Sequence, residues 1–131
     1  MKVIHQSGTR KTAVARATLV PGAGILRINN KLISTMPANM FRSKIEEAML
    51  LAGDVAGKVN VDVTVSGGGV NGQAEASRLA IAKALAQFDK KLRSKYLEYD
   101  RMFTVADVRR KETHKPNCHG KARAMRQKSY R

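Results

Sequence analysis

The first third of the chain alternates small apolar and polar side chains with a period of two, which is the period of a β-strand. Ala13, Ala15, Ala17 and Leu19 share one face, and the other face carries Val14, Arg16, Thr18 and Val20. Asn29-Asn30 can adopt positive φ and closes a tight hairpin. The pattern therefore predicts three strands, at residues 10–20, 25–28 and 31–33.

The period then lengthens to three or four residues, as in an amphipathic helix. Pro37 suits a first helical turn, and Gly53 suits the C-terminal cap of a helix that ends near Leu51. The predicted inner face of this helix consists of Phe41, Ile45, Ala48, Met49 and Ala52.

The clearest alternation is in residues 58–66, where four valines occupy every second position. Gly67-Gly68-Gly69 then predicts a turn into a second helix over residues 71–88. A polar helix is expected over residues 89–99. The inner stripe predicted for the second helix is Ala74, Ala80, Ile81, Ala84, Leu85 and Phe88.

This order predicts an α+β fold with a four-stranded, mostly antiparallel sheet covered by helices. We expect a globular domain over residues 1–100 and an extended C-terminal tail over residues 101–131. The beginning of the tail, residues 101–108, is expected to be an irregular link.

Charge separates the tail from the domain. Nine of the 25 Lys and Arg residues and only one of the ten acids lie in residues 109–131, which gives this segment +8 of the net charge of +15. Such a segment buries too little apolar surface to offset its ordering entropy, so it is expected to be extended until a polyanion orders it.

Composition narrows the class of partner to nucleic acid, an anionic membrane or acidic proteins. The sequence has no apolar run long enough to cross a membrane and no apolar leader segment, which favours a cytosolic protein. Cys118, the single cysteine, excludes an intramolecular disulfide and fits a reducing compartment.

The glycine turn resembles a phosphate-binding loop. Gly67, Gly69 and Gly72 match a dinucleotide fingerprint, but no strand with a ribose-binding acid follows. Gln73-Ala74 stands where a P-loop requires Lys-Ser/Thr. The remaining interpretations are a tight strand-to-helix turn, or a turn that meets an RNA backbone together with Arg78.

Neither metal binding nor catalysis is predicted. His114, Cys118 and His119 give an incomplete zinc set with strained spacing. The adjacent acids Glu46 and Glu47 fit a solvated helix face, and no nucleophile is accompanied by a base. We therefore expect no cofactor, no metal and no enzymatic activity.

Three segments together resemble the family of the ninth small-subunit ribosomal protein. They are GTRKTAVARATLVPGAGILRINNK, GGGVNGQAEASRLAIAKAL and KARAMRQKSYR, in the same order as in that family. The ending QKSYR is more similar to the archaeal and eukaryotic branch, because bacterial members usually end in Ser-Lys-Arg.

The resemblance implies a fold like the second domain of ribosomal protein five, with a left-handed βαβ crossover. It also implies a ribosome-bound cytoplasmic protein in the head of the small subunit, in contact with ribosomal RNA, neighbouring head proteins and P-site tRNA. No membrane and no small-molecule substrate is implied.

The charge pattern and the resemblance together give one set of candidate residues, and the resemblance alone implies a second. The expected ribosomal RNA contacts are Arg10, Lys11, Arg16, Arg78, Arg109, Arg110, Lys111, Lys115, Lys121, Arg123 and Arg126. The expected tRNA contacts are Lys128, Ser129, Tyr130 and Arg131. The alternatives are a free-standing basic protein that binds nucleic acid and a nucleotide-dependent enzyme that uses the glycine turn.

Overall fold

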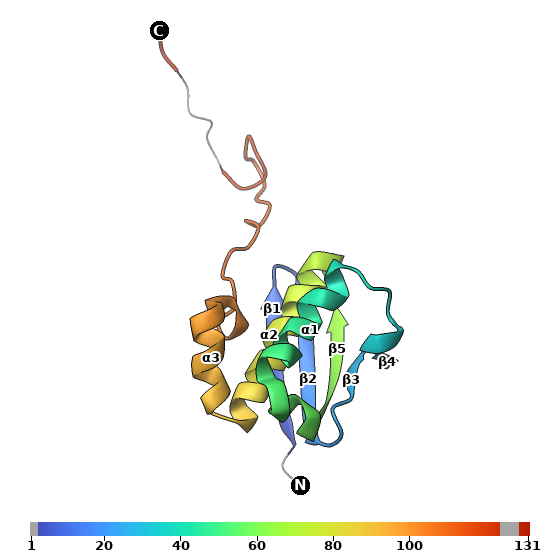
Figure 1. Cartoon of the computed structure of the whole chain (residues 1–131). Helices are drawn as coiled ribbons and strands as arrows, with labels where there is room; N and C mark the ends of the chain where they lie inside the picture. Colours follow the sequence, from blue (N-terminus) through green and yellow to red (C-terminus); the bar gives the residue numbers. More distant parts are fainter. Residues whose placement is uncertain (1–2, 124–128) are drawn as a thin grey trace.

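The computed structural model describes residues 3–123 and 129–131. In this part of the chain, five strands form one sheet in the order β1-β2-β5-β3-β4, and three α-helices accompany it. Figure 1 shows α1 and α2 lying across one face of the sheet, which we call the covered face, with α3 beside them. The class α+β is confirmed.

The prediction of four strands is wrong, because residues Ile4–Arg10 form an additional strand, β1, at the edge of the sheet. β1 pairs antiparallel with β2, Ala13–Pro21. Its sequence, IHQSGTR, is polar and contains Gly8, so local preference for a strand is weak. The strand conformation of β1 therefore depends on its pairing with β2 and its packing against α2.

β2 pairs antiparallel with β5, Val59–Ser66, and β5 pairs in parallel with β3, Leu26–Ile28. β3 continues through a hairpin into the two-residue β4, Lys31–Leu32. Asn29 and Asn30 have φ of 47° and 66°, as the predicted tight turn requires. The sheet is thus mostly antiparallel.

α1 spans Met40–Ala52, and the Asn39 side chain accepts a hydrogen bond from the Arg42 N–H at its first turn. The prediction that Pro37 lies in the first turn is therefore wrong, because Asn39 is the N-cap and Pro37 precedes it. Gly53, with φ of 58°, ends the helix as predicted.

α2 spans Val70–Phe88 and α3 spans Lys91–Tyr99, close to the predicted ranges. α2 crosses β1 so closely that a Cβ on Gly8 would lie 2.3 Å from the Ala76 carbonyl oxygen. Phe88 is exposed rather than part of the inner stripe, because it is the last residue of α2.

The core lies between the covered face and the helices, with alternate side chains of β2 and β5 fully buried against α2. The core extends under α3, where the Tyr96 hydroxyl donates to the Ala48 carbonyl oxygen and its ring stacks on Phe103. Phe103 belongs to a short 3-10 helix, Arg101–Phe103, and is fully buried. The chain therefore continues to pack against the helices beyond α3.

Candidate nucleic-acid interface

A cationic cleft lies where the turn between β1 and β2 meets the chain that leaves the domain. It is lined by Lys11, Thr12, Arg109, Arg110 and Lys111, which include four basic residues and no acid. Lys11 occupies the turn with φ of 54°, and its carbonyl oxygen accepts a hydrogen bond from Arg110 Nη1 at 3.1 Å. We use the name cationic cleft for these five residues.

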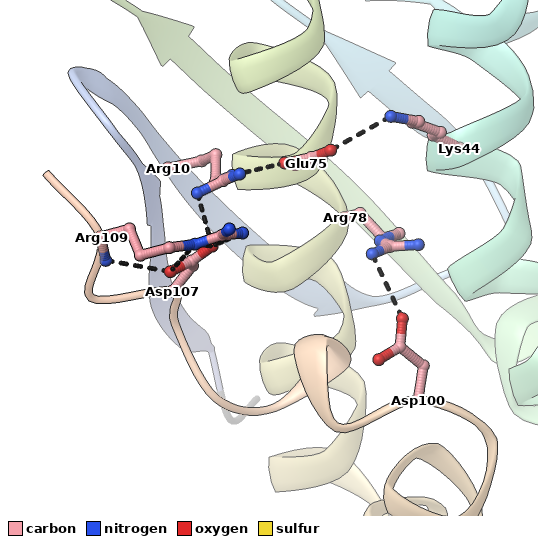
Figure 2. A network of polar contacts seen from close by, with 7 residues as sticks. All are labelled: Arg10, Lys44, Glu75, Arg78, Asp100, Asp107 and Arg109. Atoms are coloured by element: carbon pink, nitrogen blue, oxygen red, sulfur yellow. Dashed lines mark hydrogen bonds and ion pairs between the residues drawn. The ribbon is translucent and has the colours of Figure 1, made fainter.

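An ion-pair network fixes the chain at this position, as Figure 2 shows. Asp107 accepts hydrogen bonds from Arg10 Nη1 at 2.6 Å and from Arg109 Nη2 at 2.7 Å. Arg10 Nε also donates to Glu75 on α2 at 2.7 Å, and Lys44 on α1 reaches the other oxygen of Glu75 at 3.1 Å. Residue 107 is thereby tied to β1, α2 and, through Glu75, to α1.

Both carboxylates of this network remain charged at neutral pH. Hydrogen bonds from Arg109 hold the pKa of Asp107 well below its usual range. Burial alone would raise the pKa of Glu75, but hydrogen bonds from Arg10 and Lys44 outweigh it and lower that pKa. The charge of Arg10 is therefore neutralised inside the domain.

Arg78, expected to contact RNA, lies between α1, α2 and the chain after α3. Its Nη1 lies 3.0 Å from Glu47 Oε2 and its Nη2 lies 3.6 Å from Asp100 Oδ2. Its guanidinium carbon lies 4.5 Å from the centre of the Phe103 ring, and its side chain is only 15% exposed. The contacts of Arg78 are those of a side chain that packs inside the fold.

The glycine turn packs directly against the cationic cleft. Gly67 and Gly68 have positive φ, and a Cβ on Gly67 would lie 2.6 Å from the Thr12 carbonyl oxygen. Close backbone approach thus explains these glycines without a nucleotide. Gly69 provides no side-chain cap for α2, so the positive end of the helix dipole opens beside the cleft.

Arg16 lies on the other face of the sheet, which we call the open face because neither α1 nor α2 covers it. Its neighbours across the strands are Ser7 and Thr64, both polar. Arg16 is exposed, and no ion pair of the described residues includes it. The open face therefore presents an available guanidinium to a partner.

The chain beyond Arg110 leads away from the domain in Figure 1. The Lys115 N–H donates to the Lys121 carbonyl oxygen at 2.8 Å, which closes a loop, and Arg123 lies 3.6 Å from Glu112. Lys115, Lys121, Arg123, Ser129, Tyr130 and Arg131 are exposed. Arg126 and Lys128, which were also predicted as contacts, lie outside the described residues.

In the described part of the chain, neither His114, Cys118 and His119 nor any other group of three His, Cys, Asp or Glu could hold a metal ion. No helix described is long and apolar enough to cross a bilayer.

The sequence prediction did not single out Glu75, Asp100 and Asp107, and it assigned Glu47 to a solvated helix face, whereas Glu47 contacts Arg78 and Tyr99. A usable signal existed for Asp107. It is an acid separated by a single residue from a run of three basic residues, 109–111. The partners of Arg10 could not be found in this way, because Glu75 is 65 residues away and Asp107 is 97 residues away.

An α+β domain with a cationic cleft at the point where a basic segment leaves it is typical of proteins that bind a polyanion. A family model described as ribosomal protein S9/S16 matches residues 8–131. The chain belongs to this ribosomal protein S9 family.

Two archaeal relatives agree with this assignment over the full length of both chains. The "Small ribosomal subunit protein uS9" of Methanococcus vannielii and that of Methanococcus maripaludis strain C7 are each 46% identical over 134 residues, covering 100% of each partner. The prediction of the archaeal and eukaryotic branch is confirmed. The matched proteins are ribosomal proteins and not enzymes.

Proposed function

We propose that this protein is a structural constituent of the small ribosomal subunit, bound to ribosomal RNA in the head and reaching P-site tRNA with its C-terminal residues. It would work in the cytoplasm as part of the ribosome, beside neighbouring head proteins. Family membership supports the assembly, and the distribution of charge supports RNA as the partner.

The observation that carries the proposal is the cationic cleft at the point where the basic segment begins. Lys11, Arg110 and Lys111 have no acidic partner among the described residues, whereas Arg10 beside them has two. Unneutralised cations repel one another and favour a partner that brings phosphates. Arg forks suit bidentate phosphate contacts, and the open end of α2 adds to the attraction.

The proposed RNA contacts therefore divide into two groups. The exposed cations Lys11, Arg16, Arg110, Lys111, Lys115, Lys121 and Arg123 would contact phosphates directly, and Arg126, which lies outside the described residues, is proposed to do the same. Arg109 keeps one bidentate contact with Asp107 and is largely exposed, so it can meet RNA as well. Arg10 and Arg78 would act through the fold, by fixing the direction in which the chain leaves it.

The last four residues, Lys128 to Arg131, would meet the tRNA. The direction of the chain in Figure 1, away from the domain, supports a reach beyond the RNA that holds the domain. Lys128 and Arg131 offer cations to phosphates, and Tyr130 offers a ring that can stack on a base or ribose.

We also propose the left-handed crossover that the family resemblance implies. β3 and β5 are parallel neighbours, and α1 lies between them in sequence. In Figure 1, α1 lies in front of the sheet, the β5 arrow points upward and β5 lies to the left of β3. When the connecting helix lies in front of two upward-pointing strands and the second strand lies to the left of the first, the crossover is left-handed. The common βαβ unit is right-handed.

Truncation after Gln127 tests the tRNA contact. Small subunits that contain the shortened protein should sediment normally and bind P-site tRNA about tenfold more weakly, as expected for the loss of one or two charge-assisted contacts. Subunits with Lys31→Gln and Lys58→Gln, which remove the same number of cations from the domain surface, should bind tRNA normally. Equal tRNA affinity in both particles would remove the proposed role.

Salt dependence tests the RNA contact of the free protein. About eight phosphate contacts predict that log K falls with log salt with a slope of about −6 to −7. A free-standing basic protein would share this slope, so co-sedimentation is needed as well. The proposal requires that the protein migrate with the small subunit at moderate salt, and migration apart from it would favour the free-standing alternative.

A further inference from the structure

A second basic groove lies away from the cationic cleft, between the edge strand β1, the end of α2, and α3. Three basic residues line it, Lys83, Lys90 and Arg93, together with the aliphatic side chains of Leu97 and Val105 and no acid. Lys83 lies on α2, whereas Lys90 lies in the break between α2 and α3, and Arg93 lies in the first turns of α3. We call this site the α2–α3 groove.

The cations of the α2–α3 groove are not neutralised within the described chain. No ion pair among the described residues includes Lys83, Lys90 or Arg93. Lys83 Nζ donates only to the Ser7 carbonyl oxygen, at 3.2 Å. Three unpaired cations around one groove attract an anion more strongly than the same cations scattered over a surface.

The wall of the groove is apolar. Leu97 is 45% exposed and Val105 is 38% exposed, so both present aliphatic surface to whatever fills the groove. A ligand that covers this surface would exclude water and so strengthen the contacts of the surrounding cations. A partner that combines anionic groups with an apolar face fits best.

An amide pair adds a polar feature beside the cations. Gln6 Nε2 donates to Gln87 Oε1 at 2.6 Å, which leaves the Gln87 amide nitrogen as a donor and the Gln6 carbonyl oxygen as an acceptor. A ribose 2′-hydroxyl can satisfy both groups, because it donates and accepts.

We propose that the α2–α3 groove binds a stretch of RNA backbone, separate from the RNA at the cationic cleft. Phosphates would contact Lys83, Lys90 and Arg93, and ribose would lie against Leu97 and Val105 with its 2′-hydroxyl near the amide pair. This inference rests on the proposed function, which makes RNA the available polyanion. An acidic protein segment would use the same cations but would leave the amide pair without its matching hydroxyl.

The test compares two full-length variants with the same change of charge. The groove variant carries Lys83→Gln, Lys90→Gln and Arg93→Gln, and the control carries Lys31→Gln, Lys58→Gln and Lys95→Gln at exposed positions outside the groove. Affinity for small-subunit ribosomal RNA is measured over a range of KCl concentrations. Loss of three phosphate contacts should reduce the salt slope by about 2 and the affinity at 0.1 M salt by about 10²-fold.

The expected result is a groove variant that binds RNA at least tenfold more weakly than the control. Equal affinities of the two variants would overturn the inference. So would a groove variant that binds RNA like the control but has lost affinity for polyglutamate, since that result assigns the groove to an acidic protein. A cleft variant with Lys11→Gln, Arg110→Gln and Lys111→Gln separates the two proposals. If only the cleft variant loses RNA affinity, the groove proposal is overturned and the proposed function stands. If neither variant loses RNA affinity, the proposed RNA binding is overturned as well.

Discussion

Two neighbouring residues, Arg10 and Lys11, show how differently one protein can use its cations. Arg10, at the end of β1, points to the covered side of the sheet and contacts Glu75 and Asp107. Lys11 follows in the turn, is exposed and has no acidic partner in the described chain. We call Arg10, Lys44 and Arg78 the inner set, and Lys11, Arg110 and Lys111 the outer set.

The difference between the sets is the position of the acids. Glu47, Glu75, Asp100 and Asp107 lie on or beside the helices, where each contacts a member of the inner set. The inner set therefore contributes packing and ion pairs to the fold. The cations of the outer set repel one another, and we expect bound phosphates to neutralise them. We therefore expect the cations of the outer set, which have no acid beside them, to contribute more to RNA binding than those of the inner set.

The largest expected effect comes from Phe103→Ala, which breaks the inner set. Phe103 is fully buried, stacks on Tyr96 and supports the Arg78 guanidinium. Removing it should lower the free energy of unfolding by about 3–5 kcal/mol, from lost burial and the cavity left behind. Urea denaturation measures this loss.

The control for this prediction is Phe88→Ala, the same substitution at an exposed ring. Its cost should be smaller, about 1–2 kcal/mol, because 42% of Phe88 is already exposed and less apolar area is lost there. RNA affinity, measured at a temperature where both variants are folded, should match that of the unmodified protein. Equal destabilisation by the two substitutions would show that the contacts around Phe103 are not what holds α3.

The next effect in size concerns the outer set. The cleft variant Lys11→Gln, Arg110→Gln and Lys111→Gln should bind ribosomal RNA about 10²-fold more weakly at 0.1 M salt, because three phosphate contacts are lost. Its free energy of unfolding should change by no more than about 0.5 kcal/mol, as is usual for exposed positions. A loss of stability comparable to that of Phe103→Ala, with RNA affinity retained, would contradict the division into two sets.

Much of the fold was accessible from the sequence, for reasons visible in particular residues. The local sequence is enough to specify two features, the strand β5 with its four alternating valines and the Asn29-Asn30 turn. Both were predicted correctly. β1 was missed because its strand character comes from β2 and α2 and not from its own polar sequence. Pro37 was misplaced because Asn39 competes with it as the start of α1.

The candidate site was less predictable than the fold. The charge of the C-terminal segment is a property of composition, and it was evident at once. The pairing of Arg10 and Arg78 with acids, which distinguishes them from the other cations, depends on contacts across 22 to 97 residues of sequence. Pairings over such distances follow from the packing of β1, α1 and α2, which no local pattern specifies.

A smaller effect on stability distinguishes Arg78 from Arg16, two arginines that were both predicted to contact RNA. Arg78→Met should lower the free energy of unfolding by about 1–3 kcal/mol, since it removes a stacked guanidinium and leaves Glu47 and Asp100 without their partner. Arg16→Met, on the open face, should change stability by less than about 0.5 kcal/mol.

The two substitutions should have the reverse order in RNA binding. Arg16→Met removes an available cation and should weaken binding about five- to tenfold at low salt, whereas Arg78→Met should leave affinity within about twofold. Parallel thermal unfolding and RNA titration measure both quantities. If Arg78→Met proved the more damaging to RNA affinity while leaving stability intact, Arg78 would belong to the outer set.

The smallest effect is the dependence of the inner set on pH. The pKa of Asp107 and that of Glu75 are lowered from ordinary values of 3.8 and 4.5. A carboxyl whose pKa is lower in the folded state stabilises the fold fully above its unfolded pKa, and this contribution is lost as pH falls toward the folded pKa. The cations of the outer set keep their charge throughout this range.

Asp107→Asn isolates this contribution, because asparagine keeps the shape of the side chain without its charge. The variant should be less stable than the unmodified protein by a constant amount between pH 7 and about pH 5, and the gap should narrow as the pH falls below about 4. Urea denaturation at a series of pH values measures the gap. A gap that widened on acidification would mean that the Asp107 carboxylate is not stabilised by Arg10 and Arg109, and that the link between the domain and its basic segment has another origin.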